Sequence, residues 1–127
     1  MKTDIAVLRI GIASRDRMRA RTQAIARGDY KPGPDDPKVW FPSVESLAQV
    51  LSTKNQLLLE TIRKARPGSM KELAKLSGRR ESNLSRTLRT MERYRLVTLR
   101  PEGGRLVPEV PYDRLEVELP VTARAAE

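Results

Sequence analysis

The chain has 127 residues with a formal net charge of +9, and 39% of the residues are hydrophobic but only 4% aromatic, which suits one domain with an aliphatic core. It contains no cysteine and no histidine, which excludes disulfides, thiol or imidazole catalysis and Cys/His zinc sites. No apolar run approaches the roughly 20 residues of a membrane span, and no signal peptide is recognised. We therefore expect a cytoplasmic protein with no membrane partner and no cofactor.

The first part of the chain predicts a short strand followed by a basic helix. Residues 5–10 are apolar enough for a strand, although a helical continuation is an alternative. A helix is expected over residues 15–27, between the capping residues Ser14 and Gly28. Its inward stripe is thin and consists of Met18, Thr22 and Ile25. This helix carries five arginines, so it is either solvated, packed on a second subunit or placed beside a nucleic acid.

A proline-rich linker and two scaffold helices follow. Prolines at positions 32, 34 and 37 predict an extended linker over residues 29–38, and Trp40 and Phe41 are expected to anchor its end to the domain. Each of the two helices is preceded by a capping hydroxyl. We expect Ser43 to cap a helix that runs to about residue 51 and Thr53 to cap a helix that runs to residue 66. Their apolar residues need no role beyond the core.

The segment from Ser69 to Arg95 predicts two short helices around a glycine turn. Ser69 and Glu72 have the spacing of a capping box, so the first helix begins at residue 70, and Gly78 suits the sharp turn that ends it. The second helix begins near residue 81 or 82. Each helix has one apolar face, formed by Met70, Leu73, Ala74 and Leu76 in the first and by Leu84, Leu88 and Met91 in the second.

The second of these helices lies in the most basic part of the chain. Residues 79–100 carry seven arginines against two glutamates, whereas residues 101–127 carry three basic and six acidic groups. Exposed helix faces are often basic for solubility alone, but such faces usually mix both signs. Binding to a nucleic-acid backbone is therefore the better interpretation, and the acidic end should stay away from it.

These residues resemble a helix-turn-helix, because Ala74, Gly78 and Leu84 stand where that motif keeps a small residue, a glycine and an aliphatic residue. The following segment, RLVTLRPEGGRLVPEV, predicts a β-hairpin with strands over residues 97–100 and 105–107. A hairpin directly after a recognition helix resembles the wing of a MarR-like winged helix. The segments GIASRDRMRARTQAIARG, WFPSVESLAQVLS and VPYDRLEVELP extend the resemblance to small MarR-like DNA-binding proteins that are antitoxins or their relatives.

The expected fold is α+β. A winged helix-turn-helix domain occupies residues 42–120 and ends in a half-buried strand in which Leu115, Val117 and Leu119 share one face. Residues 1–41 form a strand–helix extension and linker, and are a candidate dimerisation element. Residues 121–127 form a frayed tail.

The recognition helix is expected to lie in the major groove of double-stranded DNA. The residues expected to read base edges are Ser82, Asn83, Ser85 and Arg86. Those expected to contact phosphates are Arg79, Arg80, Arg89, Thr90 and Arg93. The wing is expected to use Arg100, Gly103, Gly104 and Arg105, with its arginines in the adjacent minor groove or along its backbone.

The predicted function is sequence-specific DNA binding as a transcriptional regulator. The resemblance implies a homodimer and a repressor that regulates its own operon as the antitoxin of a toxin–antitoxin pair. Two alternatives remain: a protein-interaction module that mainly neutralises a toxin, and an RNA-binding protein, although few aromatic residues are available to stack on bases. Asp35 and Asp36 lack a third ligand, and Gly103 and Gly104 lack the lysine of a phosphate-binding loop. We expect neither a metal site nor an enzyme.

Overall fold

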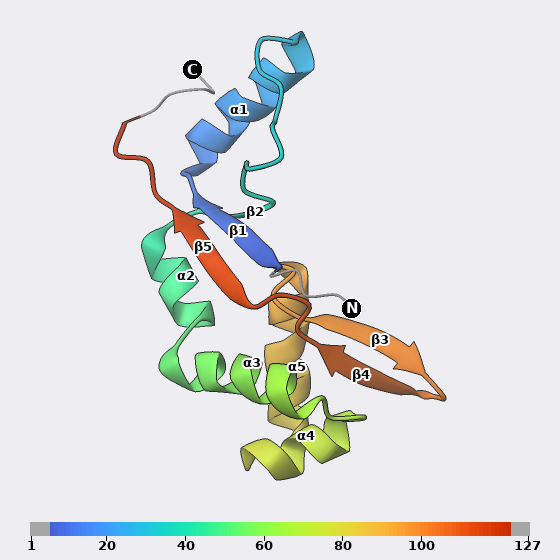
Figure 1. The fold of residues 1–127 in the computed structure, drawn as a ribbon. Helices are drawn as coiled ribbons and strands as arrows, with labels where there is room; N and C mark the ends of the chain where they lie inside the picture. Colours follow the sequence, from blue (N-terminus) through green and yellow to red (C-terminus); the bar gives the residue numbers. More distant parts are fainter. Residues whose placement is uncertain (1–5, 123–127) are drawn as a thin grey trace. The chain divides into compact units, whose positions relative to one another are not determined.

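The computed structural model describes residues 6–122, which contain five helices and five strands (Figure 1). These residues form two compact units. The first contains Ala6 and residues 48–113, and the second contains residues 7–47 and 114–122. The fold is α+β and the first unit is a winged helix-turn-helix, as predicted. Ile5 of the expected first strand and most of the expected frayed tail lie outside the described residues.

Three helices form the scaffold and the helix-turn-helix of the first unit. They are α3 (Thr53–Ala65), α4 (Met70–Ser77) and α5 (Glu81–Arg93). Gly78 ends α4 with a φ of 74°, in the left-handed region that glycine adopts without strain. The sequence therefore placed both helices of the motif and the turn between them correctly.

The caps of these helices differ from the prediction in two details. Ser52, rather than Thr53, is the N-cap of α3, since its Oγ accepts a hydrogen bond from Asn55 N at 3.2 Å. Ser69 Oγ accepts from Glu72 N at 3.1 Å as predicted. The Glu72 carboxylate, however, accepts from Gly68 N at 2.9 Å, one residue before the position of a regular capping box. Each arrangement still satisfies backbone donors that a helix N-terminus leaves without partners.

The core of the first unit is aliphatic. Its most deeply buried side chains come from all three helices and the segment after α5, and include Leu58, Ile62, Leu73, Leu84, Leu88, Met91, Leu96 and Val97. Tyr112 is buried as well, and its hydroxyl donates to Leu96 O at 2.7 Å. Leu76 does not join this core: it is 50% exposed, which corrects its predicted inward position. It instead lines a shallow groove beside α3.

The wing is a two-stranded antiparallel hairpin that follows α5. Strand β3 (Thr98–Glu102) pairs with β4 (Arg105–Glu109), and Glu102 lies opposite Arg105. Gly103 and Gly104 have φ values of 58° and 80°, so a two-residue loop with positive φ at both positions closes the hairpin. Figure 1 shows the loop projecting away from the helices of this unit.

The second unit is built on a parallel sheet of three strands with the order β2-β1-β5. These strands are β1 (Val7–Ile12), β2 (Val39–Phe41) and β5 (Arg114–Glu118). Val7 lies opposite Arg114 and Gly11 opposite Glu118, so strands from near both ends of the chain pair directly. The sequence predicted strands close to β1 and β5 but neither their pairing nor β2.

Two helices follow the first two strands of this sheet in the chain. Helix α1 (Arg15–Arg27) has the predicted caps: Ser14 Oγ accepts from Arg17 N at 3.3 Å, and Gly28 is left-handed. Its predicted stripe is wrong in part, since Ala24 is the buried residue and Thr22 is exposed. Helix α2 (Val44–Val50) begins after Ser43, whose Oγ accepts from Ser46 N at 3.1 Å as predicted. Its residues are divided between the two units.

The anchor predicted at the end of the linker is a strand. Phe41 is fully buried in β2, and the Trp40 ring packs on Gly11, where a Cβ atom would overlap it. Gly11 is therefore required for the close approach of Trp40 to β1.

Candidate nucleic-acid interface

The exposed face of α5 carries a row of polar and basic side chains. Ser82, Arg86, Arg89 and Arg93 have the i, i+4, i+7, i+11 spacing of one helix face, and all four are exposed. We call these four residues the outward row. The row lies opposite the fully buried stripe of Leu84, Leu88 and Met91. Burial of that stripe therefore fixes the direction in which the row projects.

The remaining predicted reading residues flank the outward row. Asn83 is exposed on one side of it, and Ser85 is half-buried on the other. Thr90 is half-buried, and its hydroxyl donates to Arg86 O at 3.3 Å. This bond within the helix leaves Thr90 less available to a phosphate than its sequence position suggested.

The three arginines of the outward row carry uncompensated charge. Within residues 6–122 they form no ion pair, although ten ion pairs occur elsewhere in that range. The acidic residues of α5, Glu81 and Glu92, are eleven positions apart and share one flank beside the row. The row therefore presents guanidinium groups that have no ion-pair partner. Such groups suit a polyanion, which releases bound counterions when they neutralise its phosphates.

The N-terminus of α5 adds main-chain donors beside these arginines. Arg80 is its N-cap residue, and no side chain caps the first turn. The free N–H groups of such a turn and the helix dipole favour an anion. The Arg80 side chain is exposed and forms no ion pair within residues 6–122. Arg80 thus remains suited to the phosphate contact predicted for it.

Arg79 lies in a different environment from Arg80. Its Nη2 donates to Lys54 O at 2.9 Å, and its side chain is half-buried. This bond ties the turn of the motif to the first residues of α3. The structure therefore gives Arg79 a structural contact that the sequence did not predict.

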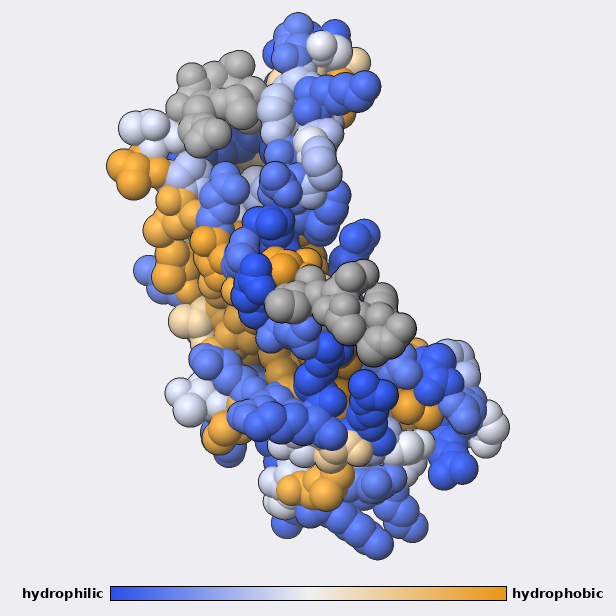
Figure 2. All heavy atoms as spheres, viewed as in Figure 1, coloured by the Kyte–Doolittle hydropathy of each residue, from blue (hydrophilic) through white to orange (hydrophobic). Residues whose placement is uncertain are grey.

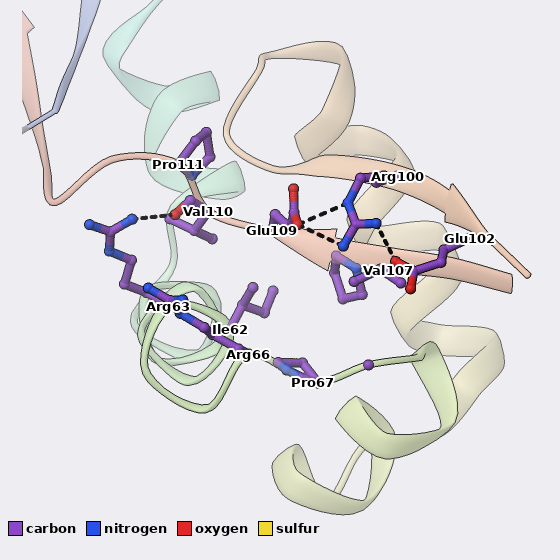
Figure 3. Close-up of a pocket in the computed structure, with 12 residues that line it drawn as sticks. Ile62, Arg63, Arg66, Pro67, Arg100, Glu102, Val107, Glu109, Val110 and Pro111 are labelled. Atoms are coloured by element: carbon purple, nitrogen blue, oxygen red, sulfur yellow. Dashed lines mark hydrogen bonds and ion pairs between the residues drawn. The ribbon is translucent and has the colours of Figure 1, made fainter. Parts of the chain in front are cut away.

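The two arginines of the wing also differ. Arg100 bonds to Glu109 at 3.0 Å and to Glu102, and Figure 3 shows its guanidinium between these carboxylates. The hydrogen bond to Glu102, followed by that to Glu109, raises the Arg100 pKa. Arg105, next to the two glycines, is exposed and forms no ion pair within residues 6–122. Within residues 6–122, the wing thus has an arginine without an ion pair beside its tip, Arg105, and an ion-paired arginine in the middle of β3, Arg100.

A pocket of about 470 Å³ lies between the end of α3 and the wing (Figure 3). Arg63 lines it and donates to Val110 O at 2.9 Å, and it also pairs with Asp113. Arg66, which ends α3 with a φ of 49°, lines the same pocket. Arg63 therefore connects α3 to the segment after β4, and Arg100 connects β3 to β4.

Helix α4 also carries two exposed lysines, which were not among the DNA-contacting residues predicted from the sequence. Lys71 and Lys75 are exposed, four residues apart, on the side of α4 opposite the buried Leu73. The first helix of a helix-turn-helix crosses the DNA backbone, so both lysines are candidates for phosphate contacts. Their i, i+4 spacing was the signal available in the sequence.

Residues 6–122 contain no group of three or more acidic residues placed to hold a metal ion. Over the same range, no helix has the length and apolar character needed to cross a membrane.

Helices α3 to α5 and the β3–β4 hairpin define a winged helix-turn-helix protein. A profile of the HVO_A0114 family matches residues 50–117, and the chain belongs to that family. Among solved structures, the chain is similar to one described as the predicted DNA-binding transcriptional regulator from E. coli. The two share 20% sequence identity with a TM-score of 0.47, over 74% of this chain and 84% of that chain. Comparison with curated proteins gives no match.

Proposed function

We propose that this protein is a transcriptional regulator that binds double-stranded DNA in a sequence-specific manner. The observation that carries the proposal is the outward row of α5, with three unpaired arginines opposite a buried stripe on the second helix of a helix-turn-helix. In this class of motif, that helix enters the major groove. The wing, with Arg105 near its tip, contacts the adjacent minor groove or its backbone.

The N-terminal half of α5 supplies the base-reading residues. Arg86 offers a planar pair of donors to guanine O6 and N7, and Asn83 offers a donor and an acceptor to adenine N7 and N6. Ser82 and Ser85 add hydrogen bonds to bases or phosphates. Arg80, Arg89 and Arg93 contact phosphates, together with the main-chain donors of the first turn. Arg79 and Thr90 make smaller contributions, because each already has a partner within the protein.

The decisive experiment begins with selection of bound fragments from the organism's own DNA, followed by titration of variants on the selected duplex and on a random duplex. Arg86→Ala should cost roughly 1–3 kcal/mol on the selected site and relax the preference at one base pair. Arg93→Ala should weaken both duplexes alike and reduce the slope of log affinity against log salt by about one unit.

The two substitutions serve as controls for each other, since both remove an exposed, unpaired arginine from the same row. Lys64→Ala provides a further control, because Lys64 is exposed on α3 and paired with Glu60 at 2.7 Å. If Arg86→Ala loses equal affinity on both duplexes, the base-reading assignment is wrong. Tighter binding to an RNA hairpin than to any selected DNA would overturn the proposal itself.

The proposed roles as a homodimer, a repressor and an antitoxin rest on the resemblance to small MarR-like proteins. On that basis we propose a homodimeric repressor that acts on its own operon and, as an antitoxin, neutralises a toxin partner. Co-expression with the neighbouring reading frame tests the toxin partner: a small protein should co-purify and alter affinity for the promoter of that operon. A promoter whose output is unchanged when the gene is deleted would contradict autoregulation.

A further inference from the structure

Strand β5 leaves one edge of the parallel sheet open. It pairs with β1 on one side, and no other strand within residues 6–122 pairs with its outer edge. About every second residue of an edge strand points its N–H and C=O groups outward, where they can pair with another chain. Two of the devices that usually prevent such pairing, a proline and a bulge, do not occur within Arg114–Glu118, whereas charged side chains, a third device, do.

The two faces of β5 differ sharply in polarity. Arg114, Glu116 and Glu118 share one face, and Leu115 and Val117 share the other with Leu119 beyond the strand end. Val117 is 49% exposed and Leu119 is 57% exposed. Figure 2 shows apolar side chains gathered along β5 and the residues that follow it. The open edge is thus bordered by an apolar surface on one face and by alternating charges on the other.

We propose that the outer edge of β5 pairs antiparallel with β5 of a second copy, about a two-fold axis at Glu116, to give one continuous six-stranded sheet. This proposal rests on the homodimer of the proposed function and names its interface. It places the interface outside residues 1–41, where the sequence had suggested it.

The charges of β5 are self-complementary in this register. Arg114 of each copy lies opposite Glu118 of the other, which gives two opposite-charge pairs. Leu115 of each copy lies opposite Val117 of the other, so the apolar face continues across the axis and exposed apolar area is covered. Moving the axis to Val117 would set Glu116 opposite Glu118 and cost both favourable pairs. Moving it to Leu115 would leave Val117 and Glu118 beyond the strand overlap.

The central Glu116 residues face each other and must be compensated. Each Glu116 accepts hydrogen bonds from Arg114 at 3.0 Å and from Arg9 at 2.6 Å within its own chain. These arginines hold the pKa of the carboxyl group below its ordinary value of 4.5. The axis therefore brings together four carboxylates, from Glu116 and Glu118 of both copies, and four guanidinium groups, from Arg9 and Arg114 of both copies, so the facing Glu116 carboxylates are compensated by cations.

The test exchanges the charges of the proposed pairs in the full-length protein. Arg114→Glu sets two glutamates opposite each other in each pair, and Glu118→Arg sets two arginines opposite each other, so each variant should dimerise at least tenfold more weakly than the wild type. An equimolar mixture should recover dimers, because each of the two 114–118 pairs across a mixed interface again joins a glutamate to an arginine. Sedimentation velocity over a range of concentrations, with one variant fluorescently labelled, measures both effects.

Arg17→Glu is the matched control. Arg17 is exposed on α1, in the same unit, and forms no ion pair within residues 6–122. The control therefore makes the same charge change as Arg114→Glu, but within residues 1–41, the alternative dimerisation element. We expect this variant to dimerise as the wild type does. Dissociation caused by Arg17→Glu alone, or single variants at β5 that dimerise normally, would overturn the proposal.

Two more outcomes separate this proposal from the DNA-binding function. A mixture that associates no better than its components, or a wild-type protein that stays monomeric at every concentration, would overturn the β5 interface. Arg114→Glu leaves the outward row intact, so its affinity for a duplex with a single half-site should match that of the wild type. If neither the wild type nor any variant binds that duplex, the result would instead contradict the proposed function.

Discussion

At the residue scale, Arg21 has a structural role, unlike the exposed arginines of α5. Its guanidinium lies 5.0 Å from the centre of the Trp40 ring and 5.5 Å from that of Tyr30, and its Nη2 is 3.1 Å from Asp36 Oδ2. The Tyr30 hydroxyl donates to the same carboxylate oxygen. Stacking and pairing together make this arginine part of the structure of the second unit.

The Asp36 carboxylate should make the stability of this unit sensitive to acid. The hydrogen bond from Tyr30, and then the contact with Arg21, hold its pKa below the ordinary value of 3.8. Because the pKa is lowered on folding, the stabilisation is complete above about pH 5. It disappears as the pH falls through the pKa of the folded state. Asp36→Asn should therefore cost roughly 1–3 kcal/mol at pH 7 and progressively less below pH 4, in urea unfolding followed by tryptophan fluorescence.

Asp35→Asn is the matched control for this prediction. The Asp35 side chain is 88% exposed and reaches Arg9 only at 3.7 Å, so its removal should change stability by less than about 0.5 kcal/mol. Equal effects of the two substitutions at pH 7, or an effect of Asp36→Asn that persists unchanged at pH 2, would contradict the assignment.

The sequence could not distinguish arginines by their partners. Arg86 and Arg93 were recognised because their positions on α5 follow from the spacing of the buried stripe. Arg79 and Arg100 looked equally free, yet their partners Lys54 and Glu109 lie in other elements. Contacts of this kind depend on how elements pack, which local patterns do not specify.

At the element scale, helices were predictable because their signals are local. Capping hydroxyls, terminal glycines and apolar periodicity placed α1, α4 and α5 to within a residue or two. Strand β2 has only three residues, too few for a periodic pattern. The pairing of β1 with β5 joins segments more than 100 residues apart, for which no short-range signal exists. The sheet of the second unit was therefore missed as a sheet, although two of its strands were seen.

The wing should use its two arginines unequally in DNA binding. Arg105 is free, whereas contact with a phosphate would require Arg100 to leave Glu102 and Glu109. We therefore expect Arg105→Ala to lower affinity several-fold more than Arg100→Ala does, by fluorescence anisotropy at fixed salt. Glu109→Gln supplies the control, since it should raise the contribution of Arg100. A larger loss from Arg100→Ala would mean that the wing rearranges on the DNA.

At the scale of the whole molecule, a homodimer with two recognition helices imposes its symmetry on the DNA. Its site should be an inverted repeat whose half-site centres are separated by one helical turn or a multiple of it, about 10 base pairs per turn. Footprinting on a selected fragment measures the spacing of the half-sites. The spacing is then changed by inserting about five base pairs, half a helical turn, between them. The insertion should abolish tight binding, and insertion of a full turn should restore part of it. A footprint over one asymmetric half-site at every protein concentration would indicate a monomer.

The division of the chain between the two units also has a consequence for the order of folding. Residues 7–47 and 114–122 form one unit although residues 48–113 intervene. Closing so long a loop in a disordered chain costs about 4 kcal/mol of entropy plus a constant, which slows formation of the β1–β5 ladder. Within the winged-helix unit, however, Asp113 N donates to Ala6 O at 2.8 Å, directly before the first pair of that ladder, Val7 and Arg114.

Once the winged helix has folded, that hydrogen bond converts a distant pairing into a local one, and the sheet can extend from it residue by residue. Hydrogen exchange should therefore show β5 amides opening whenever α5 amides open, but not the reverse. Leu84→Ala, expected to cost roughly 2–5 kcal/mol in the core of the winged helix, should speed exchange in both elements. Ile10→Ala in the sheet should speed exchange in β5 alone. Equal acceleration of α5 by both substitutions would mean that the chain folds as one cooperative body.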